Sequence, residues 1–576
     1  MENIEKIRHS LAHIMASSVL ELWPKTKLGM GPAIENGFYY DFQLPKKLEE
    51  NDLAEIEKKM KELILQKLKF EKQNITKRRA KKLFAIQPYK LELIKDLPGE
   101  NVSIYQTGEF VDLCKGPHIK STKEIAPNSF KLTKIAGAYW KGSEKNKMLT
   151  RIYGLAFQTE KELMDHLNML AEAEKRDHRK LGETLDLFVF SELVGPGLPL
   201  YTFKGTKILE ELKKYLNELQ SEIGYQEVQT PNINRAELFK VSGHYEKYKD
   251  DMFSVHSHYT KEEYFLKPMN CPQHTQIYAS KPRSYKDLPI RIADFAMLYR
   301  DEKTGELSGL TRLRSFRQDD GHCFCREDQI KDEFKSVLSA IEKAMKTFKM
   351  NYKIRFSLWD PKHPEKYLGD SKTWKKSQQM LEEILIENKI DYFKAVGEAA
   401  IYGPKMDLIS KDSLGREWQL STIQLDFIMP QRFGLTYIDS DGKEKTPVMV
   451  HRAIVGSPER FFGVLIEHYA GAFPLWLSPV QVAIIPISEK HDSYAKKIDK
   501  ELKENNIRIE LKNENETLGK KIREAEMQKI PYLLILGDKE ISANAVSVRE
   551  RGKGDSGQMQ LNNFIDKIKE QISKKE

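Results

Sequence analysis

Two short pairs of histidine and cysteine residues near the N-terminus have the spacing of a chemical site. His9 and His13 are four positions apart in a segment that predicts a helix, so both imidazoles project from one helix face. Cys114 and His118 have the same spacing, but the Gly-Pro pair between them predicts a turn. A structural role could explain either pair alone. Two such pairs in one region predict a hydrolytic or metal site.

Arginines gather in a second segment, residues 299–322, with an aromatic residue among them. The pattern predicts two antiparallel strands joined by a long loop. Strand alternation would place Arg312, Arg314 and Phe316 on one face. Guanidinium groups bind phosphates and an aromatic ring can stack on a base, so the segment predicts a nucleotide site. A solvated basic hairpin is the alternative interpretation.

A third candidate is the segment 456–460, Gly-Ser-Pro-Glu-Arg, which opens a predicted helix over residues 461–469. The N-terminus of this helix and Arg460 could together face anionic oxygens. An ordinary capped helix start is the alternative. The pattern by itself does not decide between the two.

The chain that must position these groups has 576 residues, of which 40% are hydrophobic and 31% charged. This length predicts three or four domains, and the composition excludes a disordered or collagen-like protein. Four cysteines are too few for a disulfide framework, and a net charge of +9 mildly favours a polyanionic partner. Because no apolar run approaches about 18 residues and no secretory signal is evident, we expect a cytoplasmic protein without a membrane span.

The predicted elements change in kind along the chain. Residues up to about 153 predict an α+β region, and 159–180 predict a linker helix with apolar side chains at helical spacing. Alternating segments at 352–359, 417–427 and 448–450 predict a large antiparallel sheet. After Pro479, strands and helices alternate as in a small α/β domain.

Taken in order, these segments resemble the class II aminoacyl-tRNA synthetases and, over essentially the whole chain, the bacterial-type threonyl-tRNA synthetase family. Residues 224–231 are similar to the dimer-forming first class motif, 299–322 to the second and 456–460 to the third. Three motifs in the right order make a chance resemblance improbable.

The resemblance implies a multidomain α+β and α/β protein. Its antiparallel β-sheet catalytic core would be flanked by helices, between an N-terminal α+β editing domain and a C-terminal α/β anticodon-binding domain. We expect the editing domain, linker helix, catalytic domain and anticodon-binding domain to span residues 1–156, 157–180, 181–477 and 478–576.

The threonyl assignment rests on segments 267–272, 318–322 and 451–456, which match the zinc-ligand motifs of the family. Spacing along the chain would not by itself have predicted a metal site. In the family the ion binds the amino and hydroxyl groups of threonine, and valine cannot bind in the same way. The resemblance implies that one Zn²⁺ keeps an open position for substrate and is held by Cys271, His322 and His451.

The resemblance also assigns other residues of the catalytic domain. Threonine would contact Met269, Gln318, Asp320 and Tyr402. ATP, with Mg²⁺, would contact Arg300, Glu302, Arg312, Phe316, Gln424 and Arg460. In this assignment two of the arginines reach the terminal phosphates, while the glutamate and the phenylalanine contact adenine. The expected catalytic residues are Arg300, Arg460 and His244, the last assisting transfer to the tRNA ribose.

Serine keeps the hydroxyl of threonine and lacks one methyl group, a difference worth only about 10- to 200-fold in a binding pocket. The resemblance therefore implies an editing site that hydrolyses seryl-tRNA, and no metal is expected there. Its residues would be His9, His13, Lys90, Asp112, Cys114 and His118. Two further residues match anticodon contacts in the family, Glu540 and Arg549.

Most bacterial members of the family begin with a small ubiquitin-like domain ahead of the editing domain. In this sequence the histidine pair follows the first residue almost at once, so we expect this chain to lack that domain.

The sequence thus predicts an enzyme that ligates L-threonine to tRNA(Thr) through threonyl adenylate, as a homodimer, and edits the seryl product. One alternative is a non-catalytic synthetase-like protein that binds RNA or senses amino acids. It would be expected to have lost Arg300, Arg460 or a zinc ligand, and all of these are present. A synthetase for serine, proline or alanine fits the class motifs but leaves the zinc ligands and editing residues unexplained.

Overall fold

The computed structural model describes residues 3–412 and 415–576 of the chain. It divides the chain into two compact units, Met1–Glu172 and Ala173–Glu576. The finer division into four parts stays a prediction. Among the described residues, no helix combines the length and apolar character that a membrane crossing requires.

The first unit is an α+β structure built on the long helix α1 (Asn3–Leu22), as the sequence predicted. Apolar residues at helical spacing, among them Ile7, Leu11 and Ile14, bury one face of α1 in the core of this unit. The main sheet has the order β1-β3-β8-β7, with β2 paired to β3; β1 spans Lys27–Leu28 and β2 spans Ala33–Ile34. Its longest strands are β3 (Gly37–Gln43), β7 (Phe130–Tyr139) and β8 (Met148–Ala156).

A smaller antiparallel sheet in the first unit carries the order β4-β5-β6. Its strands are β4 (Glu71–Thr76), β5 (Asn101–Thr107) and β6 (Phe110–Leu113). Helix α4 (Pro88–Asp96) begins with proline at its first turn and places Tyr89 and Lys90 in buried positions.

The predicted linker helix is two helices, α5 (Glu160–Arg176) and α6 (His178–Thr184). The prediction of one uninterrupted helix to Lys180 was therefore wrong. Asp177 causes the break, because its carboxylate accepts a hydrogen bond from the Arg179 amide and caps a new helix.

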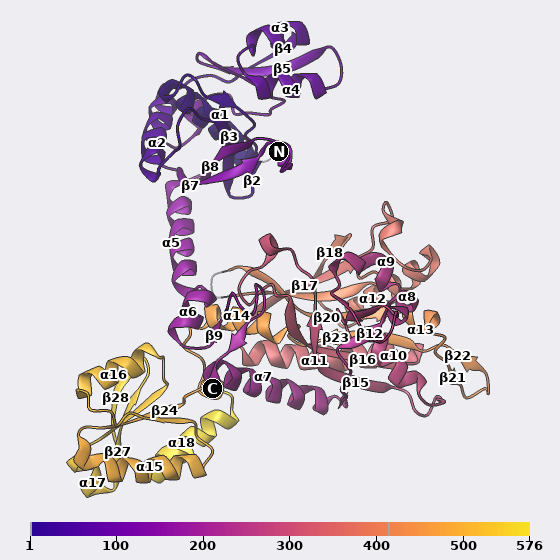
Figure 1. The fold of residues 1–576 in the computed structure, drawn as a ribbon, viewed down its shortest axis with the longest axis vertical. Helices are drawn as coiled ribbons and strands as arrows, with labels where there is room; N and C mark the ends of the chain where they lie inside the picture. Colours follow the sequence, from indigo (N-terminus) through magenta and orange to yellow (C-terminus); the bar gives the residue numbers. More distant parts are fainter. Residues whose placement is uncertain (1–2, 413–414) are drawn as a thin grey trace. The chain divides into compact units, whose positions relative to one another are not determined.

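An eight-stranded sheet forms the centre of the second unit, in the order β11-β15-β16-β23-β20-β19-β17-β18 (Figure 1). The inner strands pair antiparallel, as predicted, while β11 with β15 and β17 with β18 pair parallel at the two edges. In that order the strands span Gln226–Glu227, Ile290–Tyr299, Ser315–Cys325, Val448–Ala453, Glu417–Asp426, Lys405–Lys411, Asn351–Leu358 and Tyr392–Val396.

One face of this sheet is covered by helices and the other faces the candidate site. Cys323 and Cys325 of β16 point into the same hydrophobic core as the helices. Because side chains alternate along a strand, the even-numbered residues of β16 face the opposite side. The helices of this core are α7 (Phe203–Glu222), α11 (Ile330–Thr347), α12 (Ser371–Glu387) and α14 (Pro458–His468).

The C-terminal part of the second unit has a five-stranded sheet in the order β25-β24-β26-β27-β28 (Figure 1). Strands β24 (Val482–Pro486), β25 (Ile509–Leu511) and β26 (Tyr532–Leu536) pair parallel, as the βαβ pattern predicted. Strands β27 (Ala545–Glu550) and β28 (Gly554–Gln560) then add antiparallel. Helices α15 (Asp492–Glu504) and α18 (Leu561–Ser573) share one core with this sheet, and α16 (Leu518–Met527) packs on its other face.

Candidate functional site

Four chemically active side chains form a row across the central sheet. His322 of β16 pairs with His451 of β23, which pairs with Gln424 of β20, which pairs with Lys405 of β19. Directly paired residues of neighbouring antiparallel strands lie on the same face, a few ångströms apart. The sheet therefore brings together residues from positions 322 to 451 that no local sequence pattern connects.

Cys271 completes a cluster with the two histidines of this row. It is the first residue of helix α10 (Cys271–Ala279), and its side chain is 97% shielded from solvent, at 3% exposure. The candidate ligand atoms of Cys271, His322 and His451 all lie within 4.8 Å of one another. His322 Nε2 and His451 Nδ1 are 3.0 Å apart, so both rings direct a nitrogen into the same space.

Acidic and imidazole groups lie behind both histidines and orient them. His451 Nε2 donates to Asp426 Oδ2 at 3.0 Å, so Nδ1, which faces His322 Nε2, is the nitrogen that can act as a ligand. His322 Nδ1 contacts His274 Nδ1 at 2.7 Å, and Asp294 lies 3.7 Å from the far nitrogen of His274. Carboxylates that support ligating imidazoles are typical of functional metal sites.

The donor set fits zinc on chemical grounds. A thiol and two imidazoles are ligands that Zn²⁺ prefers, and three protein ligands leave a fourth position open. Burial raises the pKa of the Cys271 thiol and lowers the pKa of His322. Both shifts favour the neutral side chains, whereas a bound cation would favour the thiolate.

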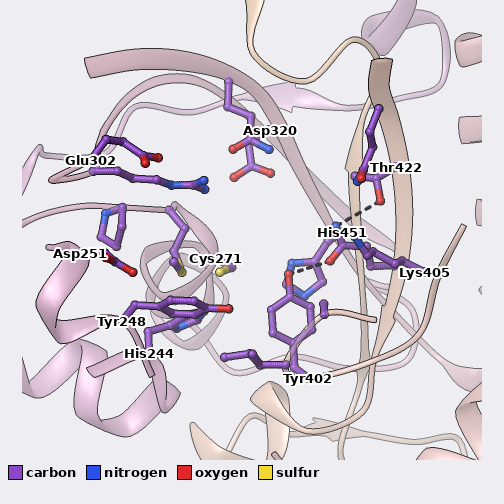
Figure 2. Close-up of a pocket in the computed structure, with 18 of the residues that line it drawn as sticks. His244, Tyr248, Asp251, Cys271, Glu302, Asp320, Tyr402, Lys405, Thr422 and His451 are labelled. Carbon is purple, nitrogen blue, oxygen red and sulfur yellow. Dashed lines mark hydrogen bonds between the residues drawn. The ribbon is translucent and has the colours of Figure 1, made fainter. Parts of the chain in front are cut away.

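A cavity of about 620 Å³ opens over this cluster (Figure 2). Its lining includes all four residues expected to contact threonine, namely Met269, Gln318, Asp320 and Tyr402. Figure 2 shows Asp320, Cys271 and His451 directed toward one shared space. The Tyr402 ring stacks on His451 with a centroid distance of 4.4 Å, and its hydroxyl donates to Gln424 at 2.9 Å.

A second, adjoining cavity of about 270 Å³ contains the residues expected to bind ATP. It shares Arg300, Glu302, Arg312 and Gln424 with the first cavity, and adds Phe316 and Arg460. The Arg300 guanidinium lies 5.2 Å from the centre of the Phe316 ring. The Phe316 ring and three arginines thus line the second cavity, which adjoins the cluster of cysteine and histidine.

Two antiparallel strands, β15 and β16, form the predicted hairpin, but β15 ends at Tyr299, where the first strand was expected to begin. The predicted common face was also wrong. Strand β16 begins at Ser315, so Arg312 and Arg314 lie in the loop where alternation does not apply. Arg314 donates to the backbone oxygen of Glu302. Arg312 lines both cavities and forms an ion pair with Glu302 at 2.7 Å. The carboxylate that was expected to contact adenine is therefore paired with an arginine in this structure.

The predicted helix after residue 456 is α14, which begins at Pro458. The Ser457 hydroxyl accepts from the Arg460 amide and caps the helix. The capped helix start is therefore confirmed, and it places Arg460 in the wall of the second cavity, while binding of anionic oxygens there stays a prediction.

His244 lies at the base of the first cavity, 1% exposed. Its Nδ1 is 2.8 Å from the Ser242 hydroxyl. Burial, together with the nearby His451, lowers the pKa of His244 to about 3, so the ring is neutral near pH 7. A neutral imidazole can accept a proton or a hydrogen bond.

Several cavity residues were missed by sequence reasoning. Thr422 stands two positions from Gln424 on β20, so strand alternation from that one residue could have found it. Lys405 lies on the neighbouring strand and could not have been found without the strand pairing. Tyr248 and Asp251 belong to short helical turns that carry no local motif.

The N-terminal cluster is assembled as predicted from α1 and the turn after β6. The candidate ligand atoms of His9, His13, Cys114 and His118 lie within 4.8 Å of one another. Cys114 Sγ is 3.3 Å from His9 Nε2 and also 3.3 Å from His118 Nε2. Burial raises the pKa of Cys114 to about 11, so this side chain is a thiol at neutral pH.

Lys90 and Asp112 form a buried ion pair at the base of the N-terminal cluster. Their side chains are 2.5 Å apart, and each is about 2% exposed. The Tyr40 hydroxyl donates to the same carboxylate at 2.6 Å, and His13 Nε2 lies 3.7 Å from it. All six predicted editing residues are therefore brought together.

The two expected anticodon contacts lie in the C-terminal sheet region. Glu540 belongs to α17 (Asp538–Ala543), and its carboxylate accepts from the Gly537 amide at 2.9 Å. Arg549 lies on β27, with Nη2 3.6 Å from a Glu526 carboxylate oxygen. Within the described part of the chain, no hydrogen bond or ion pair joins Glu540 to Arg549.

Comparison with known families matches three segments of the chain. Residues 253–469 match the tRNA synthetase class II core domain (G, H, P, S and T). Residues 481–571 match an anticodon binding domain, and residues 102–153 match the threonyl and alanyl tRNA synthetase second additional domain.

Relatives match nearly the whole chain. A threonine–tRNA ligase of Thermotoga neapolitana is 48% identical over 99% of this chain and 88% of its own length. One of Deinococcus deserti is 50% identical, covering 94% of this chain and 85% of its own. The RNA binding domain of a threonyl-tRNA synthetase from Cryptosporidium parvum has a TM-score of 0.66 at 36% identity, over 69% of this chain and 98% of that one. This chain belongs to the threonine–tRNA ligase family of class II aminoacyl-tRNA synthetases.

Proposed function

We propose that this enzyme activates threonine with ATP and transfers it to tRNA(Thr), selects the amino acid through a bound Zn²⁺, and hydrolyses mischarged seryl-tRNA at its N-terminal cluster. One observation carries the proposal. Cys271, His322 and His451 meet beneath a cavity whose other end is bordered by Arg300 and Arg312. The candidate metal ligands and the candidate phosphate-binding arginines thus line the same cavity.

Activation joins the threonine carboxylate to the α-phosphate of ATP, with pyrophosphate leaving. This displacement requires alignment of two anions and neutralisation of charge more than acid or base catalysis. Arg300 would hold the carboxylate and α-phosphate, while Arg312 and Arg460 would hold the terminal phosphates together with Mg²⁺. Phe316 offers a flat surface for the adenine, and Gln424 stands between the two cavities.

Selection of threonine follows from the polar groups beneath the first cavity. A Zn²⁺ held by Cys271, His322 and His451 would supply Lewis-acid positions for an amino group and a hydroxyl group. Asp320 faces the same space and can accept from the hydroxyl. Valine would leave these groups unpaired, and sites that bind a hydroxyl reject analogues lacking it by about 10⁴- to 10⁵-fold.

Transfer to tRNA requires a proton acceptor near the attacking ribose hydroxyl. His244 is neutral near pH 7 because burial lowers its pKa to about 3, and it borders the cavity. We assign it the role of orienting that hydroxyl and accepting its hydrogen bond.

Editing is required because serine can make the same polar contacts as threonine. The family model matched over residues 102–153 is that of the threonyl and alanyl second additional domain. The neutral imidazoles of His9, His13 and His118 can orient water and accept its proton. Lys90 lies behind them and favours developing negative charge on the ester oxygen.

Assembly and location complete the proposal. The first class motif, residues 224–231, includes the exposed edge strand β11 and follows helix α7, and we propose that two copies pair there as a homodimer. Glu540 and Arg549 would contact anticodon bases, and unpaired loop bases are the usual targets of such side chains. Because the reaction supplies ribosomes with charged tRNA, we propose that the enzyme works in the cytoplasm.

The test is exchange of pyrophosphate into ATP, measured with threonine, serine, valine, proline and alanine in parallel. Exchange with threonine, weaker exchange with serine and almost none with valine would support both the reaction and the zinc-based selection. Exchange mainly with another amino acid would contradict the specificity. No exchange in folded, zinc-containing protein would contradict the activity.

A further inference from the structure

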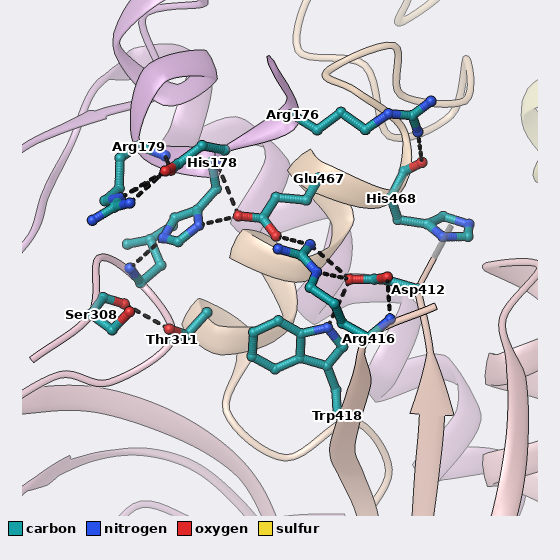
Figure 3. Close-up of polar contacts among 12 residues, drawn as sticks. Arg176, His178, Arg179, Ser308, Thr311, Asp412, Arg416, Trp418, Glu467 and His468 are labelled. Atoms are coloured by element: carbon teal, nitrogen blue, oxygen red, sulfur yellow. Dashed lines mark hydrogen bonds and ion pairs between the residues drawn. The ribbon is translucent and has the colours of Figure 1, made fainter. Parts of the chain in front are cut away.

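Two elements that line the second cavity, helix α14 and the turn 308–312, are joined by one histidine of helix α6. His178 is the first residue of α6 and is 4% exposed. It contacts helix α14, which carries Arg460, and the turn 308–312, which ends at Arg312 (Figure 3). Neither the sequence motifs nor the proposed reaction assigns this residue a role.

The hydrogen bonds of His178 fix the position of its proton. Nε2 lies 3.0 Å from the backbone nitrogen of Leu310, and a backbone N–H can only donate, so Nε2 accepts. Nδ1 therefore carries the proton and donates to Glu467 Oε1 at 2.6 Å. The same oxygen also accepts from the His178 amide at 3.0 Å. The ring is thus a neutral imidazole in one defined tautomer.

Glu467 anchors this imidazole to α14. Burial opposes its ionisation, but the hydrogen bonds from His178 and the charge of Arg416 hold the pKa of Glu467 below its usual value. Arg416 pairs with the second oxygen of Glu467 and with Asp412. Asp177, His178 and Glu467 lie close enough to hold a metal. Their polar atoms are instead bonded to protein groups, so a structural network explains them better.

The turn 308–312 packs closely against the imidazole of His178. Gly309 has a φ of +48°, and a Cβ there would lie 2.1 Å from His178 Nε2. Both the left-handed backbone and the close approach of the imidazole require glycine. On the other side of the turn, the Thr311 oxygen accepts from Arg460 Nε at 3.0 Å. Backbone hydrogen bonds between Ser308 and Arg312 close the turn.

We propose that His178 is a positioning residue for ATP. By accepting from the Leu310 amide, it holds the turn that presents Arg312 and contacts Arg460, and through Glu467 it fixes that turn to α14. The inference rests on the proposed function, because it takes these arginines as the ligands of the ATP phosphates. Cys271, His322 and His451 belong to α10, β16 and β23, none of which hydrogen-bonds to His178 among the described contacts.

A pair of substitutions separates the acceptor from the donor role. In His178→Gln, the longer side chain can place a carbonyl oxygen near the Leu310 amide. In His178→Asn, the amide can still donate to Glu467 but does not reach Leu310. We expect His178→Asn to weaken ATP binding about 10-fold or more, since small misplacement of binding groups is costly, and His178→Gln to stay within about 3-fold.

ATP affinity is measured by calorimetry on the full chain, and KM for ATP and for threonine by threonine-dependent pyrophosphate exchange. The inference predicts that His178→Asn raises the Kd and the KM for ATP. The KM for threonine and the zinc content should stay unchanged. Equal ATP affinity in the asparagine, glutamine and parent proteins would overturn it. So would an equal rise in both KM values, which indicates general disruption. Because calorimetry needs no amino acid, failure of threonine-dependent exchange would count against the proposed function only.

A second pair of variants keeps the test decisive if His178→Asn does not fold. Gly309→Ala would push against His178, whereas Gly305→Ala changes a nearby glycine whose Cβ would meet no atom within 4 Å. We expect Gly309→Ala to weaken ATP binding about 10-fold and Gly305→Ala to leave it unchanged. Equal ATP affinity in these two variants would contradict the role of the turn.

Discussion

The chain holds two clusters of cysteine and histidine that share residue types but differ in the charges behind them. In the N-terminal cluster, the nearest carboxylate, Asp112, is paired with Lys90 at 2.5 Å. In the core cluster, Asp426 accepts directly from His451 at 3.0 Å. Residue types and spacing alone do not separate a metal site from a hydrolytic one.

The difference extends to how each histidine is oriented. His9 Nδ1 donates to the Pro117 carbonyl, and His118 Nδ1 contacts the Ser10 hydroxyl, so neutral groups support both rings. Near the core cluster, Asp294 and Asp320 add negative charge. The nearby cations are Lys267, 4.0 Å from Asp294, and the buried Arg452, whose charge acts on His322. We therefore expect a divalent cation in the core, where a carboxylate supports a ligand directly, and none at the N-terminal cluster, where Lys90 adds positive charge.

The largest expected effect comes from removing the cysteine of each cluster in turn. Cys271→Ser should reduce the rate of threonine activation by more than roughly 100-fold. Loss of a residue that only supports a metal ligand typically costs up to about 100-fold, and here a ligand itself is lost. Cys114→Ser should leave activation within about 3-fold, since nothing at the core changes. Threonine-dependent pyrophosphate exchange measures both. If both variants lost threonine activation to a similar extent, the proposed difference in role between the two clusters would be wrong.

Removing imidazoles from the N-terminal cluster should affect only editing. His9→Ala combined with His13→Ala should slow hydrolysis of seryl-tRNA about 10²-fold or more, the range for loss of acid and base groups. Threonine charging should be unchanged. Hydrolysis of preformed seryl-tRNA and the amount of mischarged tRNA are the measurements. If mischarged tRNA stayed at the parent level, the editing role of this cluster would be wrong.

A smaller effect is expected from the carboxylate behind His451. Asp426→Asn should weaken zinc binding about 10- to 100-fold, because the amide supports the imidazole less well. Its carbonyl oxygen can still accept from the Ile428 and Met429 amides, so the fold should persist. Competition with a chelator measures the affinity. Asp112→Asn is the matched control, and an equal loss of zinc affinity there would count against the comparison.

The smallest effect is on the pH dependence of stability in the first unit. Burial lowers the pKa of His9, His13 and His118, so the folded unit binds fewer protons than the unfolded chain below about pH 6.5. Stability should therefore fall as the pH drops below that value, by at most about 1.4 kcal/mol per pH unit for each group.

Pulse proteolysis in urea between pH 7.5 and 5.5 measures this stability in the full chain. The variant that lacks His9 and His13 should show a shallower dependence than the parent, because two of the three titrating rings are gone. An equal or steeper dependence in the variant would show that other groups dominate.

The sequence predicted much of this fold because its strongest patterns are local. Helix α1, strands β20 and β24 and the start of α14 follow from periodicity and capping that a few neighbouring residues define. The break at Asp177 was missed because the apolar pattern continues beyond a capping residue.

The candidate site depends on pairing between distant segments, which single residues do not encode. Resemblance to a family supplied Cys271, His322 and His451, while strand register explains why they meet. Lys405 and His178 belong to no sequence motif. Strand pairing places Lys405 beside Gln424, and hydrogen bonding connects His178 to the turn that carries Arg312.

The most direct test of the central claim is the zinc content of three purified proteins, the parent, Cys271→Ser and Cys114→Ser, measured by elemental analysis after dialysis. The account predicts about one zinc per chain in the parent and in Cys114→Ser, and almost none in Cys271→Ser. Two zinc ions per chain in the parent, or loss of zinc in Cys114→Ser but not in Cys271→Ser, would contradict it.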